Sequence, residues 1–198
     1  MVTTPRALAS GQLILGLDVD PVGIATELTR RLVSRSPGSL VIRELGVSMH
    51  RARVDVAHVS DHLAGFEIKG SRDDLYRLNH QQAAFSATFE RMTLVAAATH
   101  LATGRKKIPE WWGLMSVSPD GFAVLRPAST NPSLDPAALA SLLWRDEAAA
   151  VLRLSGRSSG RLTRQQMVGT IATEMGSVEI SRAVCAALRA RQEWRAAA

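Results

Sequence analysis

An aspartate and a Glu-X-Lys triplet stand in two neighbouring runs of alternating apolar residues. Asp55 belongs to "RARVDVAHV", and Glu67 and Lys69 belong to "LAGFEIK". Two carboxylates a few ångströms apart repel one another unless a cation neutralises them, and a hard divalent cation such as Mg²⁺ prefers oxygen ligands. A lysine beside that cation can orient or help deprotonate a water and can offset charge on a phosphate. These residue types therefore suit metal-assisted hydrolysis of a phosphodiester.

The chemistry requires that the two runs form a hairpin, and residues 60–62, "SDH", are a typical short connection. With a three-residue loop closed by Val59 and Leu63, Asp55 faces Glu67 and Arg53 faces Lys69. The charged side chains then share one outward face, and the opposite face is core, formed by Val54, Val56, Phe66 and Ile68. A two-residue loop would oppose Asp55 to Ile68 and destroy the cluster. The alternative function of such a face is an exposed surface with two cross-strand salt bridges, each worth about 0.2–1 kcal/mol.

The elements around the hairpin predict one α/β core. Residues 20–35 form a helix capped by Asp20, residues 40–45 a strand, residues 71–92 an amphipathic helix with Ser71 and Asp74 as a capping box, and residues 93–99 a buried strand. Residues 114–118 and 122–128 flank "PDG" and predict a second hairpin that extends the sheet. The core thus reads helix, three strands, helix, strand, with an added hairpin.

The sequence predicts three regions in the chain. Residues 1–21 lack periodicity and are expected to pack loosely, and residues 22–130 hold the α/β core with its added hairpin. Residues 131–198 are an Arg-rich helical C-terminal extension, with helices expected over 135–154, 163–175 and 178–194. The last two meet at Gly176. They could bind DNA as a helix-turn-helix, or they could form a structural or oligomer-forming tail.

The motif and the element order together resemble the PD-(D/E)XK nuclease superfamily, which has the restriction-endonuclease-like fold. Val54 stands where the proline of the motif's name would be, and no atom of that proline contacts the metal. More narrowly, the runs "RVDV", "GFEIKG" and "TLV" and the later "IPEWWG" are similar to a branch of largely uncharacterised bacterial proteins in that superfamily.

The resemblance implies a role for each matching residue. Asp55 and Glu67 would hold Mg²⁺ or Mn²⁺, with the Ile68 carbonyl as a third protein ligand, and Lys69 would be the catalytic lysine. For the supporting acid ahead of the hairpin, Glu44 is preferred over Glu27 on the first helix. Gln81 matches the glutamine that several members aim at the site from the following helix, and the phosphate backbone would be gripped by Arg53, Arg72 and Arg77.

Charge and composition fit an anionic partner. The chain carries 24 basic and 18 acidic residues, a net charge of +6. Residues 153–198 contain eight arginines and three glutamates, so 8 − 3 = +5 of that charge lies in the extension. The lone Cys185 excludes an intrachain disulfide and a multi-cysteine zinc site. No run approaches the ~18 apolar residues of a membrane span and none resembles a secretory signal, so a cytoplasmic protein with no membrane contact is expected.

The leading hypothesis is therefore a Mg²⁺-dependent nuclease that acts on DNA, the choice of DNA over RNA resting on family analogy. A homodimer would suit cleavage of both strands. One alternative is a catalytically silent nucleic-acid-binding module. Another is a structural or regulatory component of a defence or mobile-element system.

Overall fold

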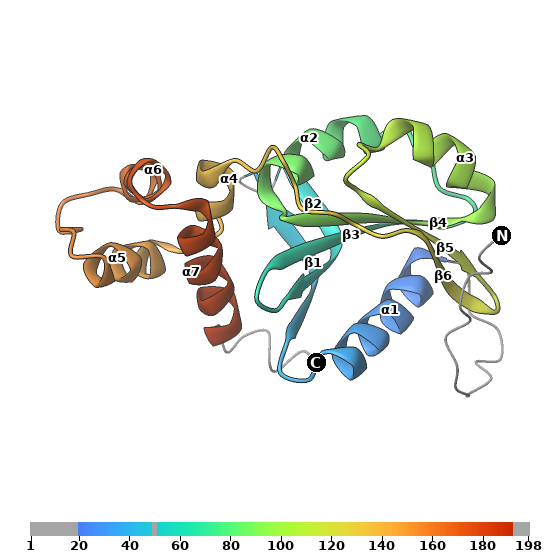
Figure 1. Cartoon of the computed structure of the whole chain (residues 1–198), viewed down its shortest axis with the longest axis horizontal. Coiled ribbons are helices and arrows are strands. Elements are labelled where there is room, and N and C mark those ends of the chain that lie inside the picture. The colour runs from blue at the N-terminus through green and yellow to red at the C-terminus, as the bar shows by residue number, and fades with distance from the viewer. Residues whose placement is uncertain (1–19, 49–50, 192–198) are drawn as a thin grey trace, which may run out of the picture.

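A single mixed sheet forms the centre of the protein (Figure 1). The structure, a computed structural model, describes residues 20–48 and 51–191, so the expectation of a loose segment over 1–21 falls almost wholly outside the described residues. Within this part the strands lie side by side in chain order: β1 (Leu40–Val47), β2 (Ala52–Val59), β3 (Leu63–Lys69), β4 (Arg91–Ala97), β5 (Gly113–Ser118) and β6 (Gly121–Arg126). β4 runs parallel to β3 and to β5, and the other neighbours are antiparallel. The α/β class and the predicted order of helix, three strands, helix and strand are confirmed.

Helix α1 (Pro21–Arg35) covers one face of the sheet. Asp20 caps it as predicted, because its Oδ1 accepts hydrogen bonds from the backbone N–H groups of Val22 at 2.6 Å and Gly23 at 2.9 Å. Its apolar stripe packs against the middle strands in a cluster of buried residues that holds Ile24, Ala25, Leu28, Val56, Ile68, Val95 and Val117. This cluster fixes which side of β3 faces α1.

Helices α2 (Leu78–Thr88) and α3 (Ala98–Lys107) lie on the opposite face (Figure 1). The helix expected over 71–92 begins seven residues later than predicted, and the capping box of Ser71 and Asp74 is wrong. Asp73 instead accepts a hydrogen bond from the Gly70 N–H at 2.7 Å, and Asp74 accepts one from the Tyr76 N–H at 2.7 Å. Carboxylates that bind nearby backbone groups in this way stabilise turns in competition with a helix.

The connection from β4 to β5 contains α3, which the sequence did not predict. The helix follows β4 without a break and Ala97 at its N-cap makes no side-chain hydrogen bond, so no capping residue marks its start. The second hairpin is confirmed as β5 and β6, which extend the sheet. Trp112 is fully buried beneath α2, where its Nε1 donates to Ser86 Oγ at 3.3 Å.

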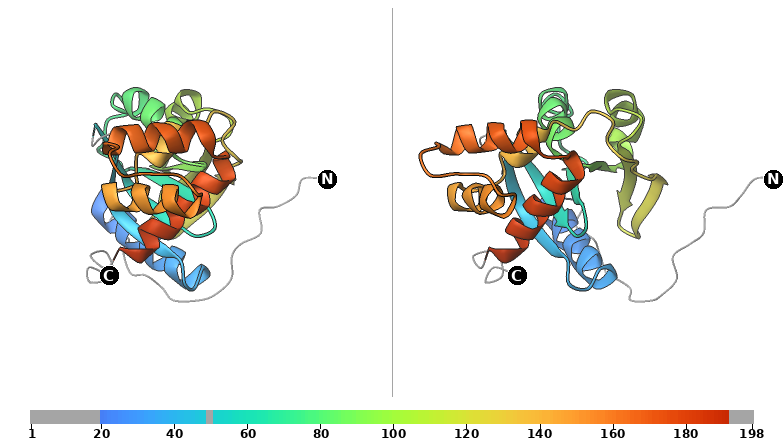
Figure 2. Two further views of the ribbon diagram at one scale, coloured as in Figure 1. Left: turned by 90° about the vertical axis from the view of Figure 1, so that its left-hand side faces the viewer. Right: turned by 60° about the vertical axis from the view of Figure 1, so that its left-hand side comes forward.

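The C-terminal extension is helical, as predicted, and lies beside the β1 end of the sheet (Figure 2). It contains α4 (Pro136–Ala140), α5 (Arg145–Leu154), α6 (Arg164–Glu174) and α7 (Ser177–Ala190). The single helix expected over 135–154 is two helices, because the chain turns at residues 141–144. Two arginines hold that turn: Arg164 donates to the Leu143 carbonyl at 2.8 Å and to the Ser141 carbonyl, and Arg191 donates to the Leu142 carbonyl at 2.7 Å.

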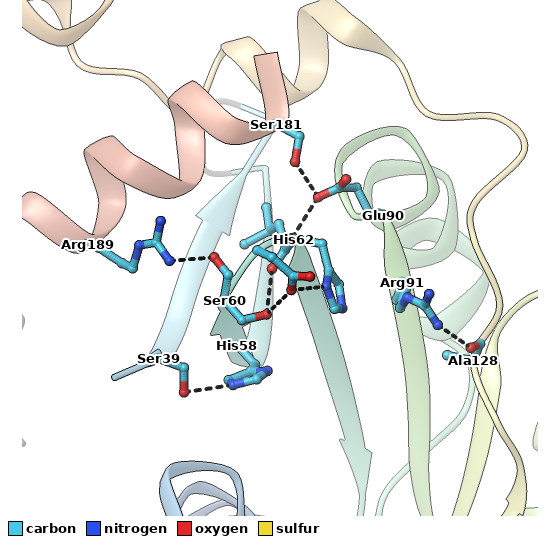
Figure 3. Close-up of polar contacts among 11 residues, drawn as sticks. Ser39, His58, Ser60, His62, Glu90, Arg91, Ala128, Ser181 and Arg189 are labelled. Atoms are coloured by element: carbon cyan, nitrogen blue, oxygen red, sulfur yellow. Dashed lines mark hydrogen bonds and ion pairs between the residues drawn. The ribbon is translucent and has the colours of Figure 1, made fainter. Parts of the chain in front are cut away.

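Helix α7 is attached to the tip of the β2–β3 hairpin (Figure 3). Glu90 Oε2 accepts hydrogen bonds from the Leu63 N–H at 2.7 Å and from Ser181 Oγ at 2.6 Å. Arg189 donates to the Ser60 carbonyl at 2.7 Å. The extension therefore contacts the same hairpin that carries the acidic residues, at its opposite end. No helix in residues 20–48 or 51–191 has the length and apolarity needed to cross a membrane.

Candidate active site

The β2–β3 hairpin has the predicted register. Val59 pairs with Leu63, and the ladder continues to Val56 opposite Phe66, so the loop comprises residues 60–62. The ladder ends there. Beyond it the Asp55 carboxylate accepts a hydrogen bond from the Ile68 N–H at 2.6 Å in place of a backbone pair. Asp55 is thus held beside β3 through this hydrogen bond, but the predicted pairs of Asp55 with Glu67 and of Arg53 with Lys69 are not part of the ladder. Arg53 pairs with Gly46 on β1 and is exposed, away from the buried Lys69.

Glu67 and Lys69 are buried, which corrects the expectation of an outward face. The residues on either side of Glu67, Phe66 and Ile68, pack toward α1, so Glu67 and Lys69 point to the face covered by α2. Only 1% of Glu67 and 8% of Lys69 is exposed. The exposed strand face with salt bridges, considered above as the alternative, is therefore wrong for this pair.

Glu67 is held by one of its two oxygens. Lys69 Nζ donates to Glu67 Oε1 at 2.7 Å, and the same Nζ lies 3.5 Å from Gln81 Oε1 on α2. Glu67 Oε2 is buried and accepts no hydrogen bond within 3.5 Å from the described residues, although the Gln81 side chain lies close enough to act on this carboxylate. Gln81 thus reaches the two residues that the sequence singled out, and the structure brings Asp55, Glu67, Lys69 and Gln81 together.

Burial and like charge shift the acid equilibria of the pair. Burial, with the charge of Asp55 as the second cause, raises the pKa of Glu67 to about 7, although the ammonium of Lys69 acts in the opposite direction. Burial also raises the pKa of Asp55 above its ordinary value, against the effect of the Ile68 N–H and Lys69. Two carboxylates share one lysine, so a further cation would stabilise their ionised forms.

Glu44 lies across from Asp55 on β1. The residues on either side of it, Arg43 and Leu45, pair with Val56 and Val54, but Glu44 itself has a left-handed backbone with φ 56°. Its charge contributes to the raised pKa of Asp55. Its own carboxylate binds Arg53 Nε at 2.5 Å and is half exposed.

Opposite the left-handed Glu44, the side chains of β2 change the face of the sheet to which they point. Val56 packs toward α1, whereas Val54 packs in the cluster on the α2 side with Ala57 and Val59. Strict alternation would place Val54 and Val56 on one face, as the sequence predicted, so that assignment is wrong for Val54. The alternation slips by one residue at Asp55, opposite Glu44, and this slip re-aims the Asp55 carboxylate toward β3.

The other expected residues lie farther from the carboxylates. Glu27, the alternative to Glu44, is on α1 at the opposite face, where Arg30 and Arg31 bind it at 2.7 Å. Arg72 and Arg77 are exposed in the segment that leads into α2. Asp73, in the same segment, was not expected at the site, yet its charge also raises the pKa of Asp55. The sequence placed Asp73 in the first turn of a helix, and nothing in that prediction indicated that Asp73 would lie near Asp55.

The donor set is small. Among residues 20–48 and 51–191, no group of three or more His, Cys, Asp or Glu side chains is arranged to hold a metal ion. Asp55 and Glu67 are two carboxylates, and a third protein ligand would have to be a backbone oxygen such as that of Ile68. Hard divalent cations with few protein ligands keep several waters, which is the state a hydrolytic site uses.

Comparison with known sequences assigns the chain to a family. The profile of the family described as bacteriophage P4 protein cII matches residues 24–197, which is most of the chain. The chain belongs to this family. The match begins in α1, passes through the carboxylate hairpin and runs beyond α7, so the family includes both the sheet and the helical extension.

Two individual proteins are similar over smaller or looser matches. Protein cII of Enterobacteria phage P4 is 30% identical over 84 residues, which is 42% of this chain and 32% of the phage protein. The aligned segment thus spans about a third of that relative's length. A solved structure, the SPO1766 protein of unknown function from Silicibacter pomeroyi, is 20% identical with a TM-score of 0.47, covering 71% of this chain and 92% of that one.

Proposed function

We propose that the protein is a metal-dependent nuclease that hydrolyses phosphodiester bonds in DNA, built on a restriction-endonuclease-like core. The observation that carries this proposal is the state of Glu67. It is a buried carboxylate with one oxygen on Lys69, one oxygen without a partner, and a second carboxylate, Asp55, on the adjacent strand. A buried carboxylate of this kind costs free energy unless a cation or a hydrogen-bond donor satisfies it, and clusters of perturbed acids are typical of functional sites.

The residues fit a divalent cation. The unpartnered Glu67 Oε2 and the carboxylate of Asp55 are hard oxygen donors, and with the Ile68 carbonyl they would hold Mg²⁺ or Mn²⁺. A bound ion of this type would supply a nucleophilic water of lowered pKa and charge stabilisation at the phosphoryl oxygens. It would also offset the charge of Asp55, which, after burial, raises the pKa of Glu67.

The chain's own side chains would divide the remaining work. Lys69 Nζ, fixed between Glu67 Oε1 and Gln81 Oε1, would orient the attacking water and offset the charge that grows on the phosphate. Gln81 would position Lys69 from α2. Glu44 would support the site through its charge near Asp55, and the exposed Arg53, Arg72 and Arg77 would grip the strand on either side.

The test is cleavage of plasmid and single-stranded DNA with Mg²⁺ or Mn²⁺ beside an EDTA control. Glu67→Gln and Lys69→Met are each expected to lower the rate by at least about 100-fold, the scale of losing one electrostatic or acid–base contribution. Gln81→Ala, a positioning residue, is expected to cost less. Lys106→Met removes an exposed lysine of α3 and is the matched control. Cleavage that survives in Glu67→Gln would refute the proposal.

A second candidate is a nucleic-acid-binding module without catalysis. The observation that favours it is the small donor set, with two carboxylates and no third acid in the described cluster. Metal-independent binding with no cleavage of any substrate would support it.

The match to a phage P4 protein favours a third candidate function, a structural or regulatory component of a mobile element, if neither binding nor cleavage is found. A homodimer remains part of the nuclease proposal, and sedimentation with and without DNA tests it.

A further inference from the structure

A pocket of about 700 Å³ lies between the sheet and the helical extension. One wall is β1 with the start of β2, and the other is the turn between α4 and α5. The charged and aromatic side chains of its lining are Arg43, Glu44, Arg53, Trp144, Arg164 and Arg191. Glu44 belongs both to this wall and to the strand position across from Asp55, so one residue of the pocket adjoins the candidate active site.

The pocket is cationic. Four arginines line it against one glutamate, and Glu147, outside the lining, binds Arg191, so the balance is 4 − 2 = +2. Arg53 offsets the charge of Glu44 through their contact at 2.5 Å. Arg164 donates to two carbonyl oxygens and, within residues 20–48 and 51–191, forms no salt bridge, so its charge is only partly offset by the nearby Glu147. An anionic ligand is therefore favoured over a neutral one.

The pocket also presents an aromatic surface above an apolar floor. Trp144 is 45% exposed, although large aromatic side chains are usually buried. Its ring is held in place by the Arg191 guanidinium, which lies 4.1 Å from the ring centroid, and Arg191 is itself fixed by Glu147 at 2.7 Å. The buried Leu45 and Leu142 form part of the floor. A rigid indole beside arginines is an arrangement that binds a base and its phosphate together.

We propose that this pocket binds one nucleotide of a single-stranded nucleic acid, with the base stacked on Trp144 and the phosphates near Arg53 and Arg164. A base within a duplex has both faces covered by its neighbours, so only an unpaired base can use the indole. The volume lies in the range of ordinary ligand pockets and suits one nucleotide rather than a duplex. The path of the bound nucleic acid rests on the proposed function: from this pocket the nucleic-acid strand would continue past Glu44 to Asp55 and Glu67.

The first test is binding of a 12-nucleotide single strand in EDTA, measured by fluorescence anisotropy. Trp144→Ala is expected to weaken binding by about 5- to 100-fold, the range found for loss of one stacked base. Leu154→Ala removes an exposed apolar side chain of α5, the helix that Trp144 precedes, and is the matched control, with unchanged affinity expected. Intrinsic fluorescence gives a second readout: quenching on binding is expected in the wild type and is expected to shrink in Trp144→Ala.

The second test separates phosphate contact from general charge. Arg164→Gln keeps an N–H donor at the position of Arg164 Nε, which binds the Leu143 carbonyl, so the turn at 141–144 is expected to persist, as circular dichroism would show. In this variant, the slope of log K for binding against log salt concentration is expected to be smaller in magnitude by about 0.7. That is the value for one phosphate contact with a single strand. Arg182→Gln makes the same charge change on an exposed position of α7 and is expected to leave the slope unchanged.

Three outcomes would overturn the inference. These are equal affinity of Trp144→Ala and Leu154→Ala, a duplex bound as tightly as the single strand with the same loss in Trp144→Ala, and a free mononucleotide bound as tightly as the oligonucleotide. The proposed function can fail separately. Binding that depends on Trp144, with no cleavage under any metal, would refute the nuclease and leave the strand site standing. Cleavage that depends on Glu67, with no dependence of binding or cleavage on Trp144, would refute the strand site and leave the nuclease proposal standing.

Discussion

At the scale of single residues, the main feature is that the two carboxylate oxygens of Glu67 have different environments. Oε1 has the lysine, and Oε2 is buried with no partner in the described part of the chain. A protein that needed this residue only for stability would gain by replacing the pair with apolar side chains, because buried ion pairs repay little of their desolvation cost. The arrangement is therefore better explained by a ligand that completes it.

The buried pair can be tested through stability. Lys69→Met leaves the Glu67 carboxylate without its cation, and we expect it to lower the free energy of unfolding by about 3 kcal/mol at pH 8. The double variant Glu67→Gln with Lys69→Met removes both charges, and its loss is expected to be smaller than that of Lys69→Met alone. Urea unfolding followed by circular dichroism measures both, and equal losses would show that the two side chains do not interact.

Much of this site was readable from the residues. The carboxylates and the lysine were found because acid and base types in a Glu-X-Lys spacing share a strand face and because a three-residue loop fixes the pairing. Gln81 was expected only from the resemblance to a nuclease superfamily. Their burial was not readable, since alternation says which residues share a face and not which helix covers that face. Asp73 was missed because its place beside Asp55 depends on the fold of the loop before α2.

At the scale of elements, α1 carries an acid with a structural task. The hydrogen bond from Arg30, followed by contact with Arg31, holds the pKa of Glu27 below its ordinary value of 4.5. A lowered pKa in the folded state gives stability that is fully present above about pH 4.5 and is lost as the pH falls through the folded value.

We therefore expect Glu27→Gln to cost about 1 kcal/mol at pH 6, and the difference from the wild type to shrink between pH 5 and pH 3. Urea unfolding across this pH range measures the difference. Glu179→Gln, an exposed position of α7, controls for the loss of one negative charge. A difference that grows on acidification would contradict the structural role given to Glu27.

The segment between β6 and α4 crosses α2 and is fastened by one buried side chain. Asn131 Nδ2 donates to the Ser86 carbonyl at 2.6 Å and to the Phe89 carbonyl at 2.8 Å, and its Oδ1 accepts from the Ser133 N–H at 2.8 Å. These carbonyls lie at the C-terminal end of α2, where helical partners run out. The side chain thus joins the extension to the helix that carries Gln81.

Replacing Asn131 with Ala leaves these buried polar groups without partners, and we expect a loss of about 2 kcal/mol in the free energy of unfolding. Thermal and urea unfolding measure it. Ser133→Ala keeps the backbone N–H that Asn131 binds and is the matched control, with little change expected. A loss equal in both variants would mean that the side-chain amide is not what fastens the segment.

Errors in the predicted elements have local causes. The strands were found because their alternation is clear, and the late start of α2 was missed because Asp73 and Asp74 resemble capping residues while binding turn backbone. Helix α3 was hidden because its first residues continue the apolar run of β4. The break at residues 141–144 depends on arginines from α6 and from the residue after α7, which lie far along the chain.

At the scale of the whole molecule, the sheet and the helical extension are expected to unfold together. Glu90 joins β3 to α7, Arg189 joins α7 to the hairpin loop, and the buried core runs without interruption from the strands to α7. We expect one transition, with circular dichroism and tryptophan fluorescence giving the same midpoint.

Glu90→Ala tests this coupling. The variant leaves the Leu63 N–H and the Ser181 hydroxyl without their acceptor, and we expect it to lower the midpoint of a transition that stays single. Two separate transitions, with the extension melting first, would show that the extension is an independent unit. The stability of the carboxylate hairpin would then not depend on α7.

The left-handed backbone of Glu44 has a consequence for selection. Glycine adopts this conformation without steric cost, so a lineage selected only for heat resistance would be expected to exchange Glu44 early for glycine or asparagine. A library of variants at this one position, ranked once for thermal survival and once for DNA cleavage, would give opposite orders if the glutamate is kept for its chemistry. Directed evolution could in this way report the purpose of a residue before its ligand is known.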